Sequence, residues 1–205
     1  MYFDIGANIG NWSLENISKC DKIIAAEASS ITYEKLLENC KNDNIKLINY
    51  AICNNKNKEI TLYHTTNNNN LSSINKNWLT SSHSRYYNEP YETIICKTLT
   101  LDDLISLYDI PELIKINVNA GEYECISSLT KKVDLLCFYW TAETINITLK
   151  CIEHLINIGF TKFHIQINNL YVYKPNDYDY NNLDMIEQIL LTKILKTDYG
   201  MIWCK

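Results

Sequence analysis

Short apolar runs alternate with amphipathic segments in the first quarter of the chain. The run MYFDI is followed by the turn GANIGNW and an amphipathic stretch to about Lys19, which predicts a strand, a tight turn and a helix. Two further strands are predicted at KIIAAE (22–27) and IKLINYAIC (45–53), on either side of a helix at TYEKLLENCKN (32–42) with one apolar face.

The same alternation resumes in the second half. It predicts helices at 99–108, 122–129, 144–159 and 183–195, and strands at 113–118, 135–140, 160–167 and 199–205. Strands that alternate with helices of this length form right-handed parallel βαβ units. We therefore expect one α/β domain that covers residues 1–205.

The stretch 65–91 interrupts the pattern. It is rich in Asn and Ser and contains His83, Arg85 and the pair Tyr86-Tyr87. Loops of this length inside a compact domain are either functional or disordered. We expect a long loop or lid over a substrate, with a disordered insertion as the alternative.

Composition narrows the classes of function. The chain has 205 residues, 46% of them hydrophobic, and a formal charge of −5 without a basic stripe, so we expect no nucleic-acid partner. No apolar run is long enough to cross a bilayer and no leader peptide is visible, so we expect no membrane association and a cytoplasmic location. The eight cysteines are dispersed without a C-x-x-C pair, which indicates reduced, buried thiols.

The turn after the first strand indicates a ligand site, because ligands of open α/β sheets bind beyond the carboxyl ends of the strands. A dinucleotide would expect G-x-G-x-x-G and an uncharged turn, whereas this turn reads G-x-x-x-G after Asp4. We interpret a carboxylate beside the ligand as favouring a sulfonium, and Glu27 ends the second strand where a ribose would be held. S-adenosylmethionine is therefore the favoured cofactor, and a dinucleotide remains the alternative.

Five segments together carry a resemblance to a known family. FDIGANIGNWS, IIAAEASSITYEKLLENC, IKLINYAIC, TLTLDDL and LIKINVNAGEYECISSL resemble the FkbM-type S-adenosylmethionine-dependent methyltransferases. The resemblance implies a Rossmann-like, seven-stranded class I methyltransferase sheet, mostly parallel with an antiparallel last strand and with helices on both faces. It also implies O-methylation of a hydroxyl on a sugar, nucleotide-sugar or glycan.

The resemblance further implies a set of cofactor-binding residues. The methionine part would be surrounded by Asp4, Gly6, Ala7, Asn8 and Gly10, with Asn11 and Trp12 at the helix start, the ribose by Glu27, Ala28 and Ser29, and the adenine by Ala51 and Ile52.

The fourth-strand motif departs from the family pattern I-K-I-D-V-E-G-A-E. Asn117 and Asn119 replace its two acids, Glu122 is retained, and Tyr139 stands where an acid often ends the fifth strand. Asn cannot act as a base, and the lost carboxylates would have been the ligands for Mg²⁺, so we expect no metal site.

Three residues remain as catalytic candidates. Asn117 can orient a hydroxyl through its amide. Glu122 lies in the first turn of a predicted helix, whose dipole should keep it ionised and only weakly basic. His83 carries the side chain best suited to proton transfer near neutral pH, and the histidines at 64, 154 and 164 are interpreted as structural.

Two hypotheses of function follow. The first is an active O-methyltransferase with a small-molecule or glycan acceptor. The second is a degenerate methyltransferase-fold protein that binds cofactor or a partner without turnover. A homo-oligomer is compatible with either.

Overall fold

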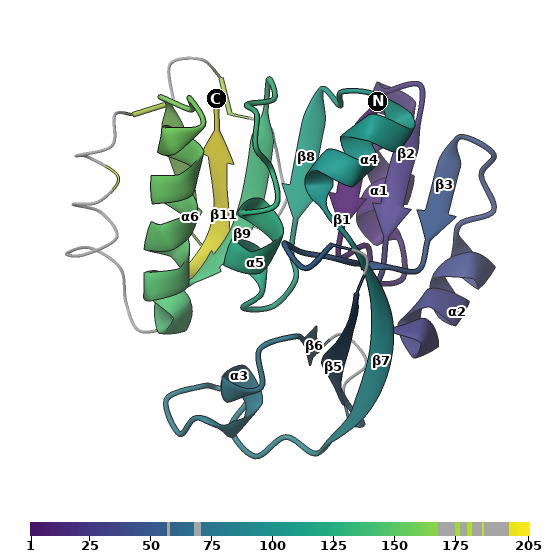
Figure 1. The fold of residues 1–205 in the computed structure, drawn as a ribbon, viewed down its shortest axis with the longest axis vertical. Coiled ribbons are helices and arrows are strands. Elements are labelled where there is room, and N and C mark those ends of the chain that lie inside the picture. The colour runs from purple at the N-terminus through teal and green to yellow at the C-terminus, as the bar shows by residue number, and fades with distance from the viewer. Residues whose placement is uncertain (57, 68–70, 168–174, 177–179, 182–185, 187–196) are drawn as a thin grey trace.

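A seven-stranded sheet with the strand order β10-β11-β9-β8-β1-β2-β3 forms the centre of the computed structural model (Figure 1). The structure describes all residues except 57, 68–70, 168–174, 177–179, 182–185 and 187–196. The strands are β1 (Tyr2–Ile5), β2 (Ile23–Ala26), β3 (Ile45–Ile48), β8 (Leu113–Ile116), β9 (Leu136–Thr141), β10 (Phe163–Ile167) and β11 (Tyr199–Cys204). The ladders from β9 to β3 are parallel, and β11 lies antiparallel to both β9 and β10. The predicted class I methyltransferase sheet is confirmed.

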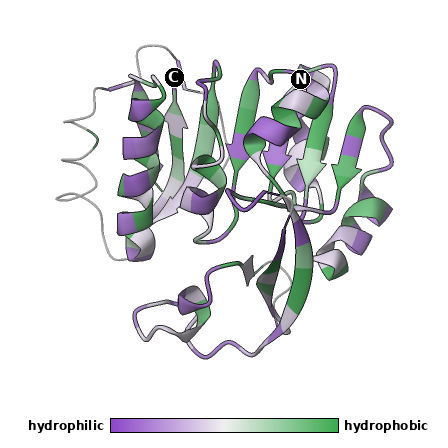
Figure 2. Ribbon diagram, in the orientation of Figure 1, coloured by the Kyte–Doolittle hydropathy of each residue, from purple (hydrophilic) through white to green (hydrophobic). Residues whose placement is uncertain are grey.

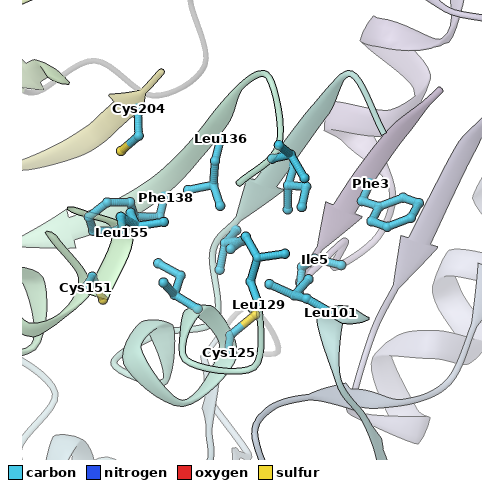
Figure 3. Packing of buried hydrophobic residues seen from close by; sticks show 14 of the residues in the cluster. Phe3, Ile5, Leu101, Cys125, Leu129, Leu136, Phe138, Cys151, Leu155 and Cys204 are labelled. Carbon is cyan, nitrogen blue, oxygen red and sulfur yellow. The ribbon is translucent and has the colours of Figure 1, made fainter. Parts of the chain in front are cut away.

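Helices cover both faces of this sheet because successive strand residues point to opposite sides. On β1, Phe3 and Ile5 belong to a core with residues of α4 (Leu101–Tyr108), α5 (Glu122–Ile126) and α6 (Ile145–Asn157) (Figure 3). The other face packs against α1 (Asn11–Asn16), which is followed by the 3-10 turn η1 (Ile17–Lys19), and α2 (Ser30–Asn39). In Figure 2 the central strands are mostly hydrophobic, whereas the helices have both hydrophobic and hydrophilic residues.

Local sequence signals set several of the helix starts. Thr100 and Asp103 form a reciprocal capping box at the start of α4, and the Ser29 hydroxyl accepts the Thr32 amide at the start of α2. After α6 the chain passes through Gly159 at φ 105, a left-handed conformation that favours glycine.

A second, four-stranded sheet extends from the carboxyl edge of the first (Figure 1). Its order is β4-β7-β5-β6, built from β4 (Ala51–Ile52), β5 (Glu59–Thr65), β6 (Ser72–Ser73) and β7 (Tyr91–Leu99). The antiparallel pair β5 and β7 runs in register from Glu59 opposite Lys97 to Thr65 opposite Tyr91. This sheet was not predicted.

The segment 65–91, expected as a long loop or lid, contains β6 and the short helix α3 (Asn77–Thr80). Its described residues have an apolar anchor: Leu71, Trp78 and Leu79 are buried together with Ala120 from the turn after β8. The segment therefore packs on the edge of the main sheet where the parallel strands end.

Of three other predictions, two can be compared with the described residues. The helix expected at 183–195 lies outside the described residues except for Ile186. All eight cysteines lie in the described part of the chain and are free, seven of them buried, as predicted. Within the ranges that the structure describes, every helix is too short or too polar to span a bilayer.

Candidate functional site

A cavity of about 470 Å³ opens where β1, β2 and β8 end. The predicted site residues that line it are Gly6, Ala7, Asn8, Asn11, Trp12, Glu27, Ala28, Ala51, Ile52 and Asn117. Asn119, noted in the fourth-strand motif, also lines the cavity. Sequence reasoning missed the other lining residues, namely Ile5, Ile9, Ala26, Thr32, Tyr50, Leu62, Ser72, Ile74, Lys115, Val118 and Gly121. Several of these come from β5, β6 and the segment after β6, which no motif indicated.

Glu27 is the best-positioned acid of the cavity. Its side chain is held by two backbone amides, from Asn8 to Oε2 at 3.0 Å and from Ser29 to Oε1 at 2.9 Å. The residue is only 8% exposed, and this burial raises the pKa of the Glu27 carboxyl, although the two amide hydrogen bonds oppose the rise. A carboxylate offers about four acceptor positions, so each oxygen retains one for a ligand.

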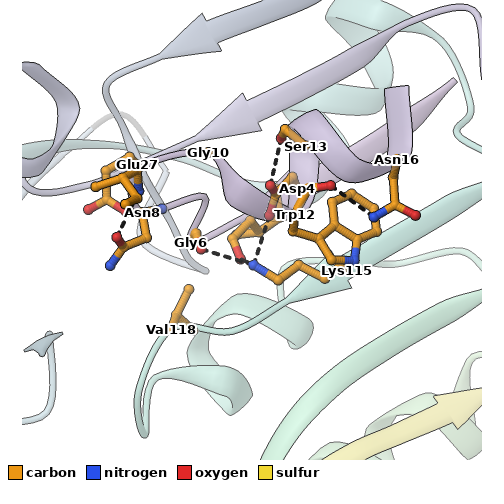
Figure 4. Close-up of polar contacts among 12 residues, drawn as sticks. Asp4, Gly6, Asn8, Gly10, Trp12, Ser13, Asn16, Glu27, Lys115 and Val118 are labelled. Carbon is orange, nitrogen blue, oxygen red and sulfur yellow. Dashed lines mark hydrogen bonds and ion pairs between the residues drawn. The ribbon is translucent and has the colours of Figure 1, made fainter. Parts of the chain in front are cut away.

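Asp4 lies beneath the turn and does not line the cavity. Asp4 and Lys115 are opposite each other in the β1–β8 ladder, and the Lys115 Nζ is 2.8 Å from Asp4 Oδ1. Ser13 donates its hydroxyl to Asp4 Oδ2 at 2.7 Å, and Lys115 also donates to the Gly6 carbonyl at 2.9 Å (Figure 4). Asp4 was expected beside the methionine part of the cofactor, but its carboxylate is set back from the cavity and its charge is balanced by Lys115.

The two glycines of the turn are required by packing. Gly6 has φ 75, and a Cβ there would overlap with the Asn117 carbonyl at the end of β8. Gly10 has φ 91, and a Cβ there would overlap with the thiol of Cys40, the residue that follows α2. Gly10 was expected to admit a ligand, but it does not line the cavity. The turn can thus lie close to both neighbouring elements.

The turn after β8 forms the opposite wall. Asn119 has φ 52 and Ala120 has φ 66, left-handed conformations that are rare outside glycine. The Asn119 side-chain amide donates to the Ser72 carbonyl at 3.2 Å, and the Ser73 hydroxyl donates to the Asn119 carbonyl. Strand β6 is therefore tied to this turn and forms a wall of the cavity with it.

Comparison with known proteins agrees with this geometry. Residues 4–189 match the family described as Methyltransferase FkbM domain. The chain belongs to the FkbM methyltransferase family. The resemblance in the sequence motifs is thus confirmed, and family and fold together support an S-adenosylmethionine-dependent methyltransferase.

Solved structures share the fold at low sequence identity. A precorrin-6y C5,15-methyltransferase from Geobacter metallireducens GS-15 is 14% identical with a TM-score of 0.50, over 100% of this chain and 78% of that one. The precorrin 8W decarboxylase from Methanobacterium thermoautotrophicum is 10% identical with a TM-score of 0.52, over 100% and 80%. No curated protein sequence matches the chain.

Within the FkbM motif, Glu122 differs from expectation. It is buried, it does not line the cavity, and its Oε1 accepts the Val118 amide at 3.0 Å. Burial raises the pKa of Glu122 to about 7, which outweighs the backbone hydrogen bonds that lower it. At this pKa the carboxyl is only partly ionised near neutral pH, so the helix dipole does not keep it fully ionised, and its contact is with the turn after β8.

The other catalytic candidate outside the cavity is His83. It is exposed, it lies between α3 and β7, and it does not line the cavity. Ser29 is likewise not a lining residue, because its hydroxyl caps α2 and lies 3.2 Å from His64 Nδ1.

One acid just beyond the fifth sheet strand was not among the predicted site residues. Strand β9 runs on to Thr141, and Glu143 follows in the 3-10 turn η2 (Ala142–Thr144). Glu143 Oε1 is 2.7 Å from Arg85 Nε, so this acid ties the segment after α3 to the edge of the main sheet. Within the described residues, no three His, Cys, Asp or Glu side chains come together as a metal site.

Proposed function

We propose that the protein is an S-adenosylmethionine-dependent O-methyltransferase that methylates a hydroxyl of a sugar, nucleotide-sugar or glycan. The observation that carries the cofactor part is the geometry of Glu27. Two backbone amides fix its carboxylate at the end of β2, and one acceptor position on each oxygen remains for a pair of hydroxyl groups.

The remaining lining residues fit the same cofactor. The cavity volume of about 470 Å³ lies in the range of small-molecule sites. Ala51, Ile52 and Leu62 form an apolar wall suited to an adenine ring. At the end of β1, Ala7 and Asn8 line the turn beside Glu27.

Chemically, the cofactor would supply an activated methyl group on a sulfonium, and the protein would supply position. The cavity walls would hold an acceptor hydroxyl in line with that group, which can account for much of the rate. The Asp4–Lys115 ion pair stiffens the turn that lines the cavity. Asn117 lines the cavity and can orient the hydroxyl, but it cannot remove its proton.

The acceptor class is supported by the family and by polar side chains on one wall. Ser72, Asn117 and Asn119 bring hydroxyl and amide groups to the cavity. Such groups bind hydroxyl-rich molecules by directional hydrogen bonds and carry no charge.

One observation favours a second candidate, a protein that binds cofactor without turnover. Asn117 and Asn119 occupy the positions of the family's two acids at the cavity wall. Release of S-adenosylhomocysteine with a panel of nucleotide-sugars and glycans separates the two, since only the active enzyme produces it. Calorimetric titration with S-adenosylmethionine and NAD gives the prior test: NAD binding without S-adenosylmethionine binding would exclude both candidates.

A further inference from the structure

A buried histidine lies directly behind the cavity wall. His64 is on β5 and is 2% exposed, and its Nδ1 is 2.7 Å from the hydroxyl oxygen of Ser72. Ser72 lines the cavity, whereas His64 does not. From the sequence, His64 was interpreted as structural because it falls in or beside a regular element.

A second hydroxyl approaches the same nitrogen, and the two hydroxyls differ in role. Ser29 Oγ is 3.2 Å from His64 Nδ1 and also accepts the Thr32 amide as the cap of α2. Ser72 Oγ makes the shorter contact and belongs to a cavity-lining residue. Ser72 is therefore the hydroxyl that can connect His64 to a bound molecule.

The position of Ser72 is fixed from both sides. Its carbonyl accepts the side-chain amide of Asn119 from the turn after β8, and its backbone pairs with His64 in the β5–β6 ladder. Ser72 thus shares the cavity wall with Asn117 and Asn119, the polar wall assigned above to the acceptor.

We propose that Ser72 and His64 form the proton-accepting pair of the methyl transfer, in which Ser72 contacts the acceptor hydroxyl and His64 acts through Ser72. The proposal rests on the proposed function. It supplies the base that Asn117 and Asn119 cannot be, since amide side chains do not accept a proton at physiological pH.

Methyl transfer and proton transfer take place together. In the tautomer with its proton on Nε2, His64 Nδ1 accepts the hydrogen bond of the Ser72 hydroxyl. As the acceptor oxygen bonds to the methyl carbon, the bond from that carbon to sulfur breaks and its electron pair stays on sulfur. The acceptor proton moves to Ser72 Oγ while the Ser72 proton moves to Nδ1, so the products are a methyl ether, S-adenosylhomocysteine and an imidazolium.

Two acidic residues lie on elements next to this pair. Glu27 accepts the backbone amide of Ser29, and Glu92 on β7 is the cross-strand neighbour of His64.

The first test needs no acceptor. Nitrogen NMR of the histidine-labelled protein at pH 8 is expected to show an unprotonated Nδ1 on His64, with a resonance that shifts in Ser72→Ala. Assignment comes from His64→Gln, and His164→Gln on β10 serves as the control. A protonated Nδ1, or a resonance unchanged in Ser72→Ala, would overturn the proposal whether or not turnover is found.

The second test measures S-adenosylhomocysteine release with UDP-glucose and methyl β-glucoside as probes. Ser72→Ala and His64→Gln should lower kcat about 10²- to 10⁴-fold, the usual contribution of a positioned base, with cofactor Kd within about threefold of the wild type. His64→Gln should also lose the acidic limb of the pH profile. Full kcat in both variants, or a more than tenfold loss of cofactor affinity in Ser72→Ala, would refute the assignment.

Different outcomes would contradict the acceptor class and the role of Ser72 and His64. If the wild type turns over neither probe, the acceptor class in the proposed function loses its support. The NMR result alone then decides whether Ser72 and His64 have the geometry of a base pair.

Discussion

The buried ion pair beneath the turn gives the strongest stability prediction. Asp4 is fully buried and the Lys115 side chain is 3% exposed, so neither charge is solvated by bulk water. In Lys115→Met, Asp4 would keep only the Ser13 hydroxyl among the side-chain partners described above. A buried ion pair broken on one side costs about 3–5 kcal/mol, a large share of the roughly 5–15 kcal/mol that stabilises a typical domain.

Removal of both charges should restore most of this loss. In Asp4→Asn/Lys115→Met the amide can still interact with Ser13, and no unpaired charge is buried, so stability should return to within about 2 kcal/mol of the wild type. The control is Lys56→Met, which breaks an ion pair with Asp103 of similar length, 2.7 Å against 2.8 Å, on a lysine side chain that is 61% exposed. This exposed pair should be worth less than about 1 kcal/mol.

The assay is urea unfolding followed by tryptophan fluorescence and far-UV circular dichroism, with m-values compared between variants. The free energy of unfolding should decrease in the order wild type, Lys56→Met, double variant and Lys115→Met. It is refuted if Lys115→Met costs no more than Lys56→Met, or if the double variant is less stable than Lys115→Met alone.

Three further outcomes are expected. Glu122 has a folded pKa of about 7 against an ordinary 4.5, so the folded state binds the extra proton and stability should fall by about 3 kcal/mol as pH rises through this window. Urea unfolding of Glu122→Gln from pH 4 to 8 should lack that slope, whereas Glu38→Gln on exposed α2 surface should keep it. Gly6→Ala should lower the free energy of unfolding by more than about 2 kcal/mol, because it adds overlap with Asn117 to the cost of a positive φ. Gly159→Ala, at φ 105, should lose less, because a Cβ there would make only an ordinary contact with the Lys132 side chain. Asn117→Asp should not raise the rate of S-adenosylhomocysteine release if Ser72 and His64 are the base, and a tenfold gain would indicate that the natural site is impaired.

The main sheet was predictable because its signals are local. A run such as Leu113–Ile116 is buried on all four residues, and the strands β1, β2, β8 and β9 are each followed by a turn and a helix. The first turn and Glu27 could likewise be placed at the cavity, since parallel strands end at the same edge.

What could not be predicted depends on partners that are distant in sequence. Asp4 and Lys115 are 111 residues apart, so nothing near Asp4 indicates that its charge is balanced. The ionisation of Glu122 depends on burial, which a helix-dipole argument does not include. The hairpin of β5 and β7 encloses residues that look like loop, and His64 meets Ser72 only through the pairing of β5 with β6.

The most direct test of the account is calorimetric titration of S-adenosylmethionine into the wild type and Glu27→Ala. We expect one site per chain in the wild type and at least about 100-fold weaker binding in the variant, because each hydrogen bond to a charged group contributes about 1.5–3 kcal/mol. Circular dichroism and the urea midpoint establish that the variant is folded. No binding to the wild type, or equal affinity in both proteins, would contradict the assignment of this cavity as the cofactor site.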